Sequence, residues 1–212
     1  MTYEIKQQIL SLVLEKVPFN GWRQDHLRTS ASELGISEAL LHNVFPNGVI
    51  DLLEFYTFMG DQQMKTVLGS KDVQAPRIRD RVATAVQLRL EVQSNHMEAT
   101  RQALAIIAMP AYAIRGTRML YRTVDCIWYS IGDSSTDISF YTKRGLLAAV
   151  YASTLMFWLN DRSQDNSDTW SFLERRIDNV MHIQKIRGSL KPTGKYFPVP
   201  LRTLCAFATK AK

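Results

Sequence analysis

Cysteine and histidine, which form disulfide bonds and bind zinc, are scarce: the 212 residues include only two cysteines and four histidines. Cys126 and Cys205 lie far apart in the chain, and the histidines are scattered singly. Small secreted proteins need several cysteines for disulfides, and zinc sites need ligands at short, regular spacings. The composition therefore excludes a disulfide-stapled fold and a structural zinc site, and it indicates a reducing compartment.

Long apolar runs are also missing, since no stretch approaches the roughly 20 residues that a membrane-spanning helix needs. The first eight residues resemble neither a signal peptide nor an arginine-rich transit peptide. We therefore expect a protein that is not exported. In a bacterium we expect it in the cytoplasm at the inner face of the membrane, and as a processed mitochondrial protein on the matrix side of the inner membrane.

Catalytic patterns are absent as well. The chain has no nucleophile beside a base, no glycine-rich phosphate loop and no Glu-x-x-His pair. Asp133 and Asp137 could form a carboxylate pair, but their position around an expected helix start favours capping. We interpret the histidines as surface or capping residues. We therefore expect no enzymatic activity, no metal and no cofactor.

Helical periodicity is present over most of the chain. Apolar residues make up 46% of it, enough for a sizeable core, and no alternating strand pattern interrupts them. Pro18, Asn20 and Gly21 are expected to end the first helix, and Gly35 the second. Ser37 is expected to cap the third helix, and Pro46, Asn47 and Gly48 to end it. The expected helices cover about 5–18, 25–34, 38–45, 49–69, 77–94, 96–109, 112–131, 136–160 and 167–187.

Residues 31–46 resemble the helix-turn-helix of TetR-type repressors, with Gly35 at the turn and Phe45 as the closing aromatic. Such a motif binds DNA when cations surround its second helix. Between residues 24 and 60, however, Arg28 is the sole lysine or arginine, against five carboxylates. A charge of −4 repels the phosphate backbone, so we expect no binding of nucleic acid. A ligand-responsive TetR-family transcriptional regulator is the alternative function.

The positive charge is concentrated near the C-terminus. Residues 185–212 carry seven lysines and arginines and no acidic residue, and because the whole chain is +6, the preceding 184 residues carry −1. After a linker with prolines and glycines, apolar residues recur at helical spacing among cations, which suits contact with an anionic membrane surface. The residues expected to make this contact are Leu201, Arg202, Leu204, Cys205, Phe207, Ala208 and Lys210.

The most specific pattern is a composite motif in the second half of the chain. It combines Trp128, Gly-Asp-Ser-Ser-Thr-Asp at 132–137, Phe-Tyr-Thr-Lys-Arg at 140–144 and Leu-Ala-Ala-Val-Tyr at 147–151. This composite is similar to the TetR-like, lipid-binding accessory proteins of coenzyme Q (ubiquinone) biosynthesis. The resemblance covers about residues 4–183. A capped helix hairpin alone would also explain part of the motif.

The resemblance implies an all-α, TetR-like fold in three parts. These are an N-terminal three-helix, helix-turn-helix bundle at 1–48, a larger helical lipid-binding and dimerisation domain at 49–187, and a linker with a membrane-contact helix at 188–212. It also implies a homodimer that binds an isoprenoid quinone precursor, or a phospholipid, and presents it to the diiron hydroxylase of ubiquinone synthesis. The implied docking patch for the hydroxylase consists of Asp125, Ile127, Phe140, Tyr141 and Arg144.

The larger helical part contains more bulky apolar residues than one buried stripe per helix requires. Core packing or a dimer interface would account for them, and so would a cavity for an isoprenoid tail. Both interpretations stay open on the sequence. The candidates for contact with the lipid are Leu88, Val92, Leu104, Ile107, Met109, Trp128 and Ile131.

Overall fold

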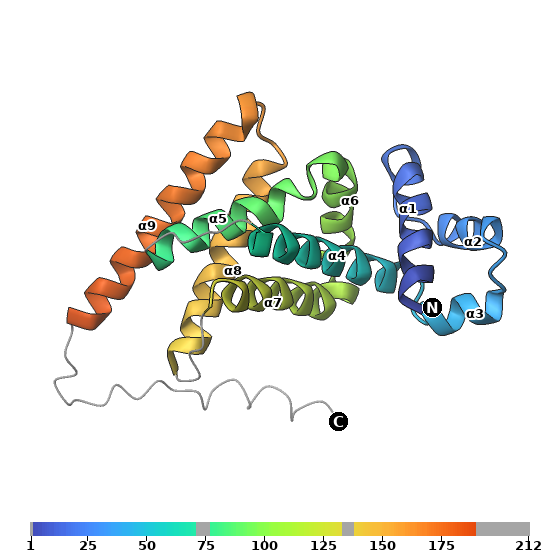
Figure 1. Cartoon of the computed structure of the whole chain (residues 1–212), viewed down its shortest axis with the longest axis horizontal. Coiled ribbons are helices and arrows are strands. Elements are labelled where there is room, and N and C mark those ends of the chain that lie inside the picture. The colour runs from blue at the N-terminus through green and yellow to red at the C-terminus, as the bar shows by residue number, and fades with distance from the viewer. Residues whose placement is uncertain (1, 71–76, 133–137, 190–212) are drawn as a thin grey trace, which may run out of the picture. The chain divides into compact units, whose positions relative to one another are not determined.

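The structure is a computed structural model that describes residues 2–70, 77–132 and 138–189, without the side chains of 138–140 and 181–189. Within these residues the fold is all helical, as expected, and no strand occurs. Short 3-10 turns lie at Ser94–His96, Pro110–Tyr112 and Gln164–Asn166. The α-helices (Figure 1) are α1 Thr2–Asn20, α2 Gln24–Glu33, α3 Glu38–Val44, α4 Val49–Ser70, α5 Ile78–Glu91, α6 Met97–Ile107, α7 Ala113–Ser130, α8 Ile138–Trp158 and α9 Ser167–Ser189.

Helix α1 is longer than the 14 or so residues that the sequence predicts, because it begins at Thr2 and includes Pro18 in its last turn. It ends at Asn20, within the stop expected at Pro18, Asn20 and Gly21. A proline removes one backbone donor and crowds the preceding turn. The turn is nevertheless closed by Gly21, whose N–H donates to the Val17 carbonyl at 2.8 Å. Gly21 has a φ of 77°, the left-handed conformation with which helices commonly end.

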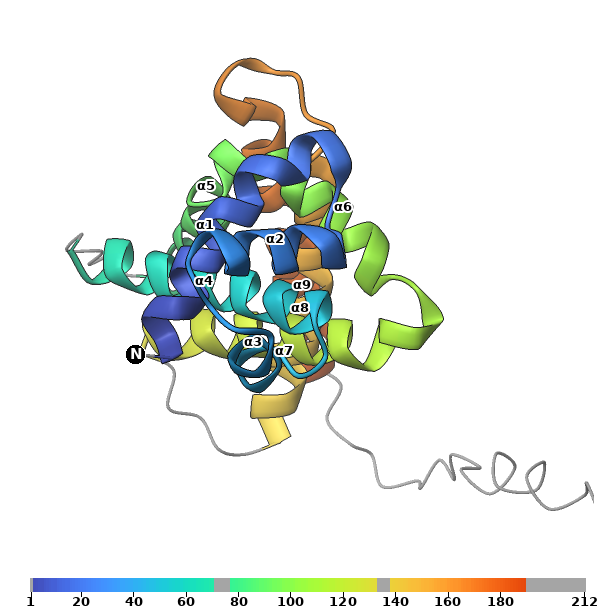
Figure 2. The ribbon, with the colours of Figure 1, turned by 90° about the vertical axis from the view of Figure 1, so that its right-hand side faces the viewer.

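The turn between α2 and α3 forms as its sequence predicts. Gly35 follows α2 with a φ of 68°, a conformation that costs glycine little. Ser37 then caps α3, because its side-chain oxygen accepts a hydrogen bond from the Leu40 N–H at 3.3 Å. Local chemistry therefore suffices to define this pair of short helices, which face the viewer together with α1 in Figure 2.

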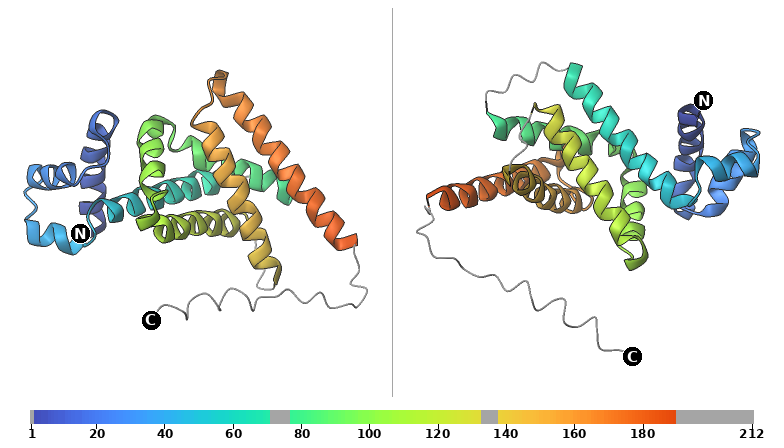
Figure 3. Two further views of the ribbon diagram at one scale, coloured as in Figure 1. Left: turned by 180° about the vertical axis from the view of Figure 1, so that it is seen from behind. Right: turned by 90° about the horizontal axis from the view of Figure 1, so that it is seen from below.

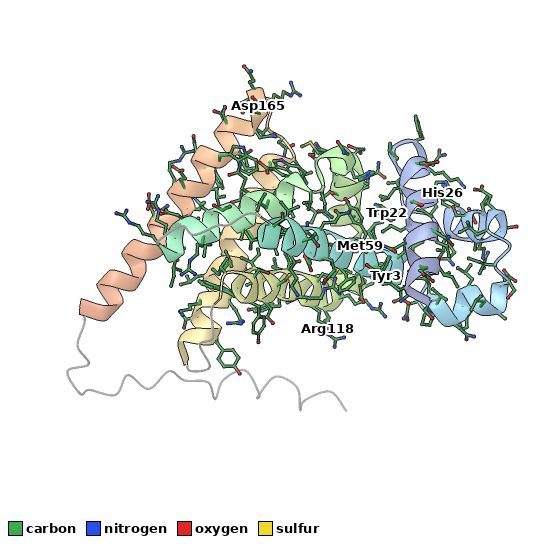
Figure 4. All side chains as sticks on the ribbon, in the orientation of Figure 1. Tyr3, Trp22, His26, Met59, Arg118 and Asp165 are labelled. Carbon is green, nitrogen blue, oxygen red and sulfur yellow. The ribbon has the colours of Figure 1, made fainter. Side chains whose placement is uncertain are left out.

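The first three helices share one hydrophobic core with the helices that follow them. Buried residues from α1 to α4, α6 and α7 belong to a single cluster, and residues 1–178 form one compact unit. Trp22, labelled in Figure 4, donates its indole N–H to the Ala99 carbonyl at 2.9 Å. Its ring packs against Tyr56, with ring centroids 5.4 Å apart. The packing thus continues across residue 48, where the sequence predicts a functional boundary.

Helices α4 and α7 run side by side through the larger part of this unit (Figures 1 and 3), with α5, α6 and α8 packed around them.

The first turns of α9 are fixed by Asp161, which accepts hydrogen bonds from the backbone N–H groups of Ser163 and Thr169 at 2.8 and 2.9 Å. Burial raises the pKa of Asp161, but hydrogen bonds from the Thr169 hydroxyl, the Ser163 hydroxyl and these two backbone N–H groups outweigh it and lower the pKa to about 2. None of the described helices is both long and apolar enough to cross a membrane.

Candidate functional site

A cavity of about 590 Å³ lies between α4, α5, α6, α7 and α8. This volume is within the range of small-molecule sites, which are lined mainly by apolar groups. Apolar side chains from three helices form most of its wall. They are Ala103, Leu104 and Ile107 of α6, Met119 and Leu120 of α7, and Ala152, Leu155 and Met156 of α8.

One edge of the cavity depends on a close approach between two helices. Gly116 of α7 faces the end of α6, where a Cβ atom on this residue would lie 3.1 Å from the carbonyl oxygen of Ile107. That distance is tighter than ordinary van der Waals contact, so glycine allows the two backbones to lie this close. Both residues line the cavity.

The cavity is polar where α4 and α5 meet, and the residue at the centre is Arg89. Its side chain is 1% exposed, and its Nε donates to Asp61 Oδ1 at 2.7 Å. Its Nη1 donates to Gln93 Oε1 at 2.8 Å and its Nη2 to the Thr57 carbonyl at 3.2 Å. Asp61 also accepts a hydrogen bond from Thr123 Oγ1 at 2.9 Å. We call Asp61, Arg89, Gln93 and Thr123 the polar cluster.

Two features hold the guanidinium of Arg89 in this place as a cation. A Cβ atom on Gly60 would lie 2.7 Å from Arg89 Nη1, so the glycine leaves the space that the guanidinium occupies. Burial lowers the pKa of Arg89, but the negative charge of Asp61 and the hydrogen bond to it act in the opposite direction, and the pKa lies above its ordinary value. The polar cluster therefore joins α4, α5 and α7 through a charged, buried ion pair.

Two buried tyrosines lie next to the polar cluster and also line the cavity. The Tyr56 hydroxyl is 2.7 Å from Thr100 Oγ1, and burial raises the pKa of Tyr56 to about 12. Tyr151, the last residue of the composite motif, is 5% exposed, and burial raises its pKa as well. Both phenols are protonated at neutral pH and can donate hydrogen bonds.

The structure brings together two of the seven residues predicted to contact a lipid, Leu104 and Ile107. Val92 lines a separate groove beside α1, and Met109 is half exposed after the end of α6. The remaining three, Leu88, Trp128 and Ile131, are buried but are not part of the cavity lining.

The predicted docking patch is partly accessible. Tyr141 is 76% exposed, and the Asp125 side chain is 42% exposed. Arg144 is buried, forms an ion pair with Asp125 and lies over the ring of Tyr129, 5.6 Å from its centroid. Ile127 has no exposed surface, so it belongs to the hydrophobic core beneath this part of α7. The side chain of Phe140 lies outside the described residues.

The seven residues predicted to contact a membrane, from Leu201 to Lys210, also lie outside the described residues. Among the described residues, no group of three or more histidine, cysteine, aspartate or glutamate side chains is arranged to hold a metal ion.

Comparison with known proteins agrees with the composite motif. The COQ9 family model matches residues 113–184, which span α7, α8 and most of α9. The human ubiquinone biosynthesis protein COQ9, mitochondrial, is 31% identical over 202 residues, or 91% of this chain and 62% of the human protein. The COQ9-B protein of Xenopus laevis is also 31% identical, over 91% of this chain and 68% of its own length. The chain belongs to the COQ9 family. It spans less than two thirds of the human protein's length.

The fold of this COQ9-family chain is also similar to that of a TetR transcriptional regulator from Nitrosomonas europaea. The two superimpose with a TM-score of 0.67 over 84% of this chain and 99% of the regulator, at 17% sequence identity. This likeness establishes the TetR-like fold, as predicted from the helix-turn-helix and the composite motif.

The ion pair at the cavity yields a prediction about stability. Arg89→Met leaves Asp61 buried without its main counter-ion, which should lower the free energy of unfolding by about 3–5 kcal/mol. Adding Asp61→Asn removes the uncompensated charge and should recover part of that loss. Urea-induced unfolding followed by circular dichroism measures both effects.

The matched control is Arg23→Met, since Arg23 pairs with Asp25 at 3.5 Å and both side chains are more than half exposed. An exposed pair of this kind contributes less than about 1 kcal/mol. Equal losses in the Arg23 and Arg89 variants would contradict the structural importance given to the buried pair.

Proposed function

We propose that this COQ9-family chain is a non-enzymatic, lipid-binding protein of ubiquinone biosynthesis. It binds an isoprenoid quinone precursor at a membrane surface and presents it to the diiron hydroxylase of that pathway. The observation that carries the proposal is the apolar cavity between α4, α5, α6, α7 and α8. Its volume of about 590 Å³ and its aliphatic wall suit part of a prenyl chain, because burial of such a chain gains about 25 cal/mol per Å².

The alternative, a DNA-binding regulator, is supported by the fold likeness but not by the surface of α3. The exposed residues of this helix are Glu38, Ala39, Leu40, His42 and Asn43, which include a carboxylate and no lysine or arginine. The nearest cation on α2, Arg28, lies 3.8 Å from Glu38. A recognition helix needs cations for phosphates and amide or guanidinium groups for base edges. The charge of this face therefore favours lipid presentation over transcription.

Filling the cavity tests lipid binding. The purified chain should carry prenyl or quinone lipids, enriched over an unrelated protein from the same host and detected by mass spectrometry of organic extracts. Ala152→Trp places a large ring in the cavity and should reduce the bound lipid at least severalfold. The control Ala149→Trp changes an exposed position on the same helix that does not line the cavity. Equal lipid in both variants, or none in the wild type, would count against the proposal.

The docking of the hydroxylase is proposed at the accessible part of the patch. Tyr141 offers a large, exposed aromatic ring, and aromatic anchors ringed by charge often dominate the energy of an interface. The Asp125–Arg144 ion pair links α7 to α8 close to this ring. We propose that Tyr141 and Asp125 contact the hydroxylase and that Arg144 positions Asp125.

Tyr141→Ala should therefore weaken binding of the hydroxylase by about 2 kcal/mol or more, which is roughly thirtyfold in Kd. Its melting temperature should remain near that of the wild type, because the side chain is largely exposed. Tyr121→Ala, at an exposed tyrosine of α7 outside the patch, serves as the control. Calorimetric titration that finds the same Kd for both variants would rule out the patch.

Homodimer formation is a further part of the proposal. On α8, Met156 is 65% exposed and Phe157 36% exposed, and Phe157 stacks on Phe172 of α9 with ring centroids 4.6 Å apart. Apolar side chains that remain exposed on neighbouring helices favour a protein interface. We propose that α8 and the first turns of α9 pair with a second copy.

Membrane contact is proposed for the basic C-terminal segment. Cations near an anionic surface each contribute about 1 kcal/mol, and the short apolar stripe adds a smaller hydrophobic gain. A chain truncated after Arg187 should remain folded and lipid-loaded but should no longer sediment with vesicles of phosphatidylglycerol and phosphatidylcholine. Leu204→Glu in the full chain should weaken sedimentation even at low salt. A truncated chain that sediments as well as the full one places the membrane contact elsewhere.

A further inference from the structure

Tyr151 has a position that the composite motif alone does not explain. It lies on α8, lines the cavity and is 5% exposed. Within the described residues its hydroxyl has no hydrogen-bond partner, yet it is not one of the fully buried unpaired atoms, so the oxygen retains some accessible surface. A buried phenol normally finds a hydrogen-bond partner, because leaving it unpaired costs free energy. The Tyr151 hydroxyl on the cavity wall is therefore a donor that is available to a guest.

Arg89 adds further donors at the same end of the cavity. A guanidinium has five N–H groups, and within the described residues three of them are used by Asp61, Gln93 and Thr57. Arg89 and Tyr151 are close enough to influence each other electrostatically, and both line the cavity. This end therefore has hydrogen-bond donors in excess, and it suits a group that carries acceptor oxygens.

The charge of the polar cluster limits what kind of acceptor fits. Arg89 is paired with Asp61 at 2.7 Å, and both side chains are 1–2% exposed, so this buried pair has no net charge. Arg122, whose Nε lies 3.6 Å from Asp61 Oδ2, is 39% exposed, so water partly screens its charge. Arg89 is thus already neutralised inside the protein, and burial of an additional anion such as a phosphate would remain costly. A neutral group with carbonyl or ether oxygens gains the hydrogen bonds without that cost.

We infer that Tyr151 and Arg89 bind the oxygen-bearing ring of a neutral quinone-type lipid, while its prenyl tail extends along the apolar wall toward Met156. The inference rests on the proposed lipid binding and adds to it the orientation of the ligand and the residues that select its head. Tyr151 is a specificity-determining residue in this assignment. It distinguishes an oxygenated ring from a hydrocarbon of equal size.

Tyr151→Phe removes the hydroxyl and keeps the ring. Calorimetric titration of the full chain with ubiquinone-1, and separately with prenylbenzene as a probe without ring oxygens, measures the selection. The wild type should prefer ubiquinone-1. Tyr151→Phe should raise the Kd for ubiquinone-1 about tenfold, as the loss of one hydrogen bond does. The Kd for prenylbenzene should stay unchanged. Tyr121→Phe, at an exposed tyrosine outside the cavity, should bind both probes as the wild type does.

A second measurement reports on the hydrogen bond itself. The carbonyl stretching band of bound ubiquinone-1 should lie at lower frequency in the wild type than in Tyr151→Phe, because a donated hydrogen bond weakens the C=O bond. An equal rise in Kd for both probes would show that Tyr151 only shapes the cavity wall, and it would overturn the assignment. If Tyr151→Phe changes neither the Kd for ubiquinone-1 nor its carbonyl band, the quinone ring binds elsewhere, and the assignment is overturned too. Failure of both probes to bind the wild type would overturn lipid binding in this cavity altogether.

Discussion

The buried ion pair between Asp61 and Arg89 is the constraint on which the rest of the larger helical part depends. It joins α4 to α5, and Thr123 extends it to α7. Charges that are 1–2% exposed are tolerated only with good partners, so these three helices must keep their relative positions. Arg89 of this pair lines the cavity. The same interaction that fixes the helices therefore also fixes the chemistry at one end of the candidate site.

Much of the fold could be predicted because its helix boundaries follow local rules. Gly35 and Gly48 adopt positive φ where the sequence predicts breaks, and Ser37 caps the helix that it precedes. The first helix ends inside the stop expected at Pro18, Asn20 and Gly21, with Pro18 in the last turn and Gly21 closing it. The TetR-like architecture could be predicted from the helix-turn-helix and the composite motif, which depend on short stretches of sequence.

The site was harder to predict, because a cavity depends on how five helices meet. A surplus of apolar residues located two lining residues, Leu104 and Ile107, but it could not separate them from core residues such as Leu88. A signal for the polar end was nevertheless present. Asp61 and Arg89 interrupt otherwise apolar stripes on α4 and α5, and a charge at a buried helical position suggests a partner or a ligand. That Asp61 pairs with Arg89 depends on the tertiary packing of α4 against α5, which the sequence pattern alone does not reveal.

The contact at Gly116 has a consequence for how the cavity can respond to ligands of different size. There, backbone lies against backbone, so that edge has a fixed width. Met119 and Met156 line other parts of the wall, and methionine side chains rearrange at low cost because they are unbranched. The cavity is therefore rigid on one side and compliant on the other. A homologous series of prenyl chains would be accommodated by rotamer changes of the methionines, with α6 and α7 keeping their spacing.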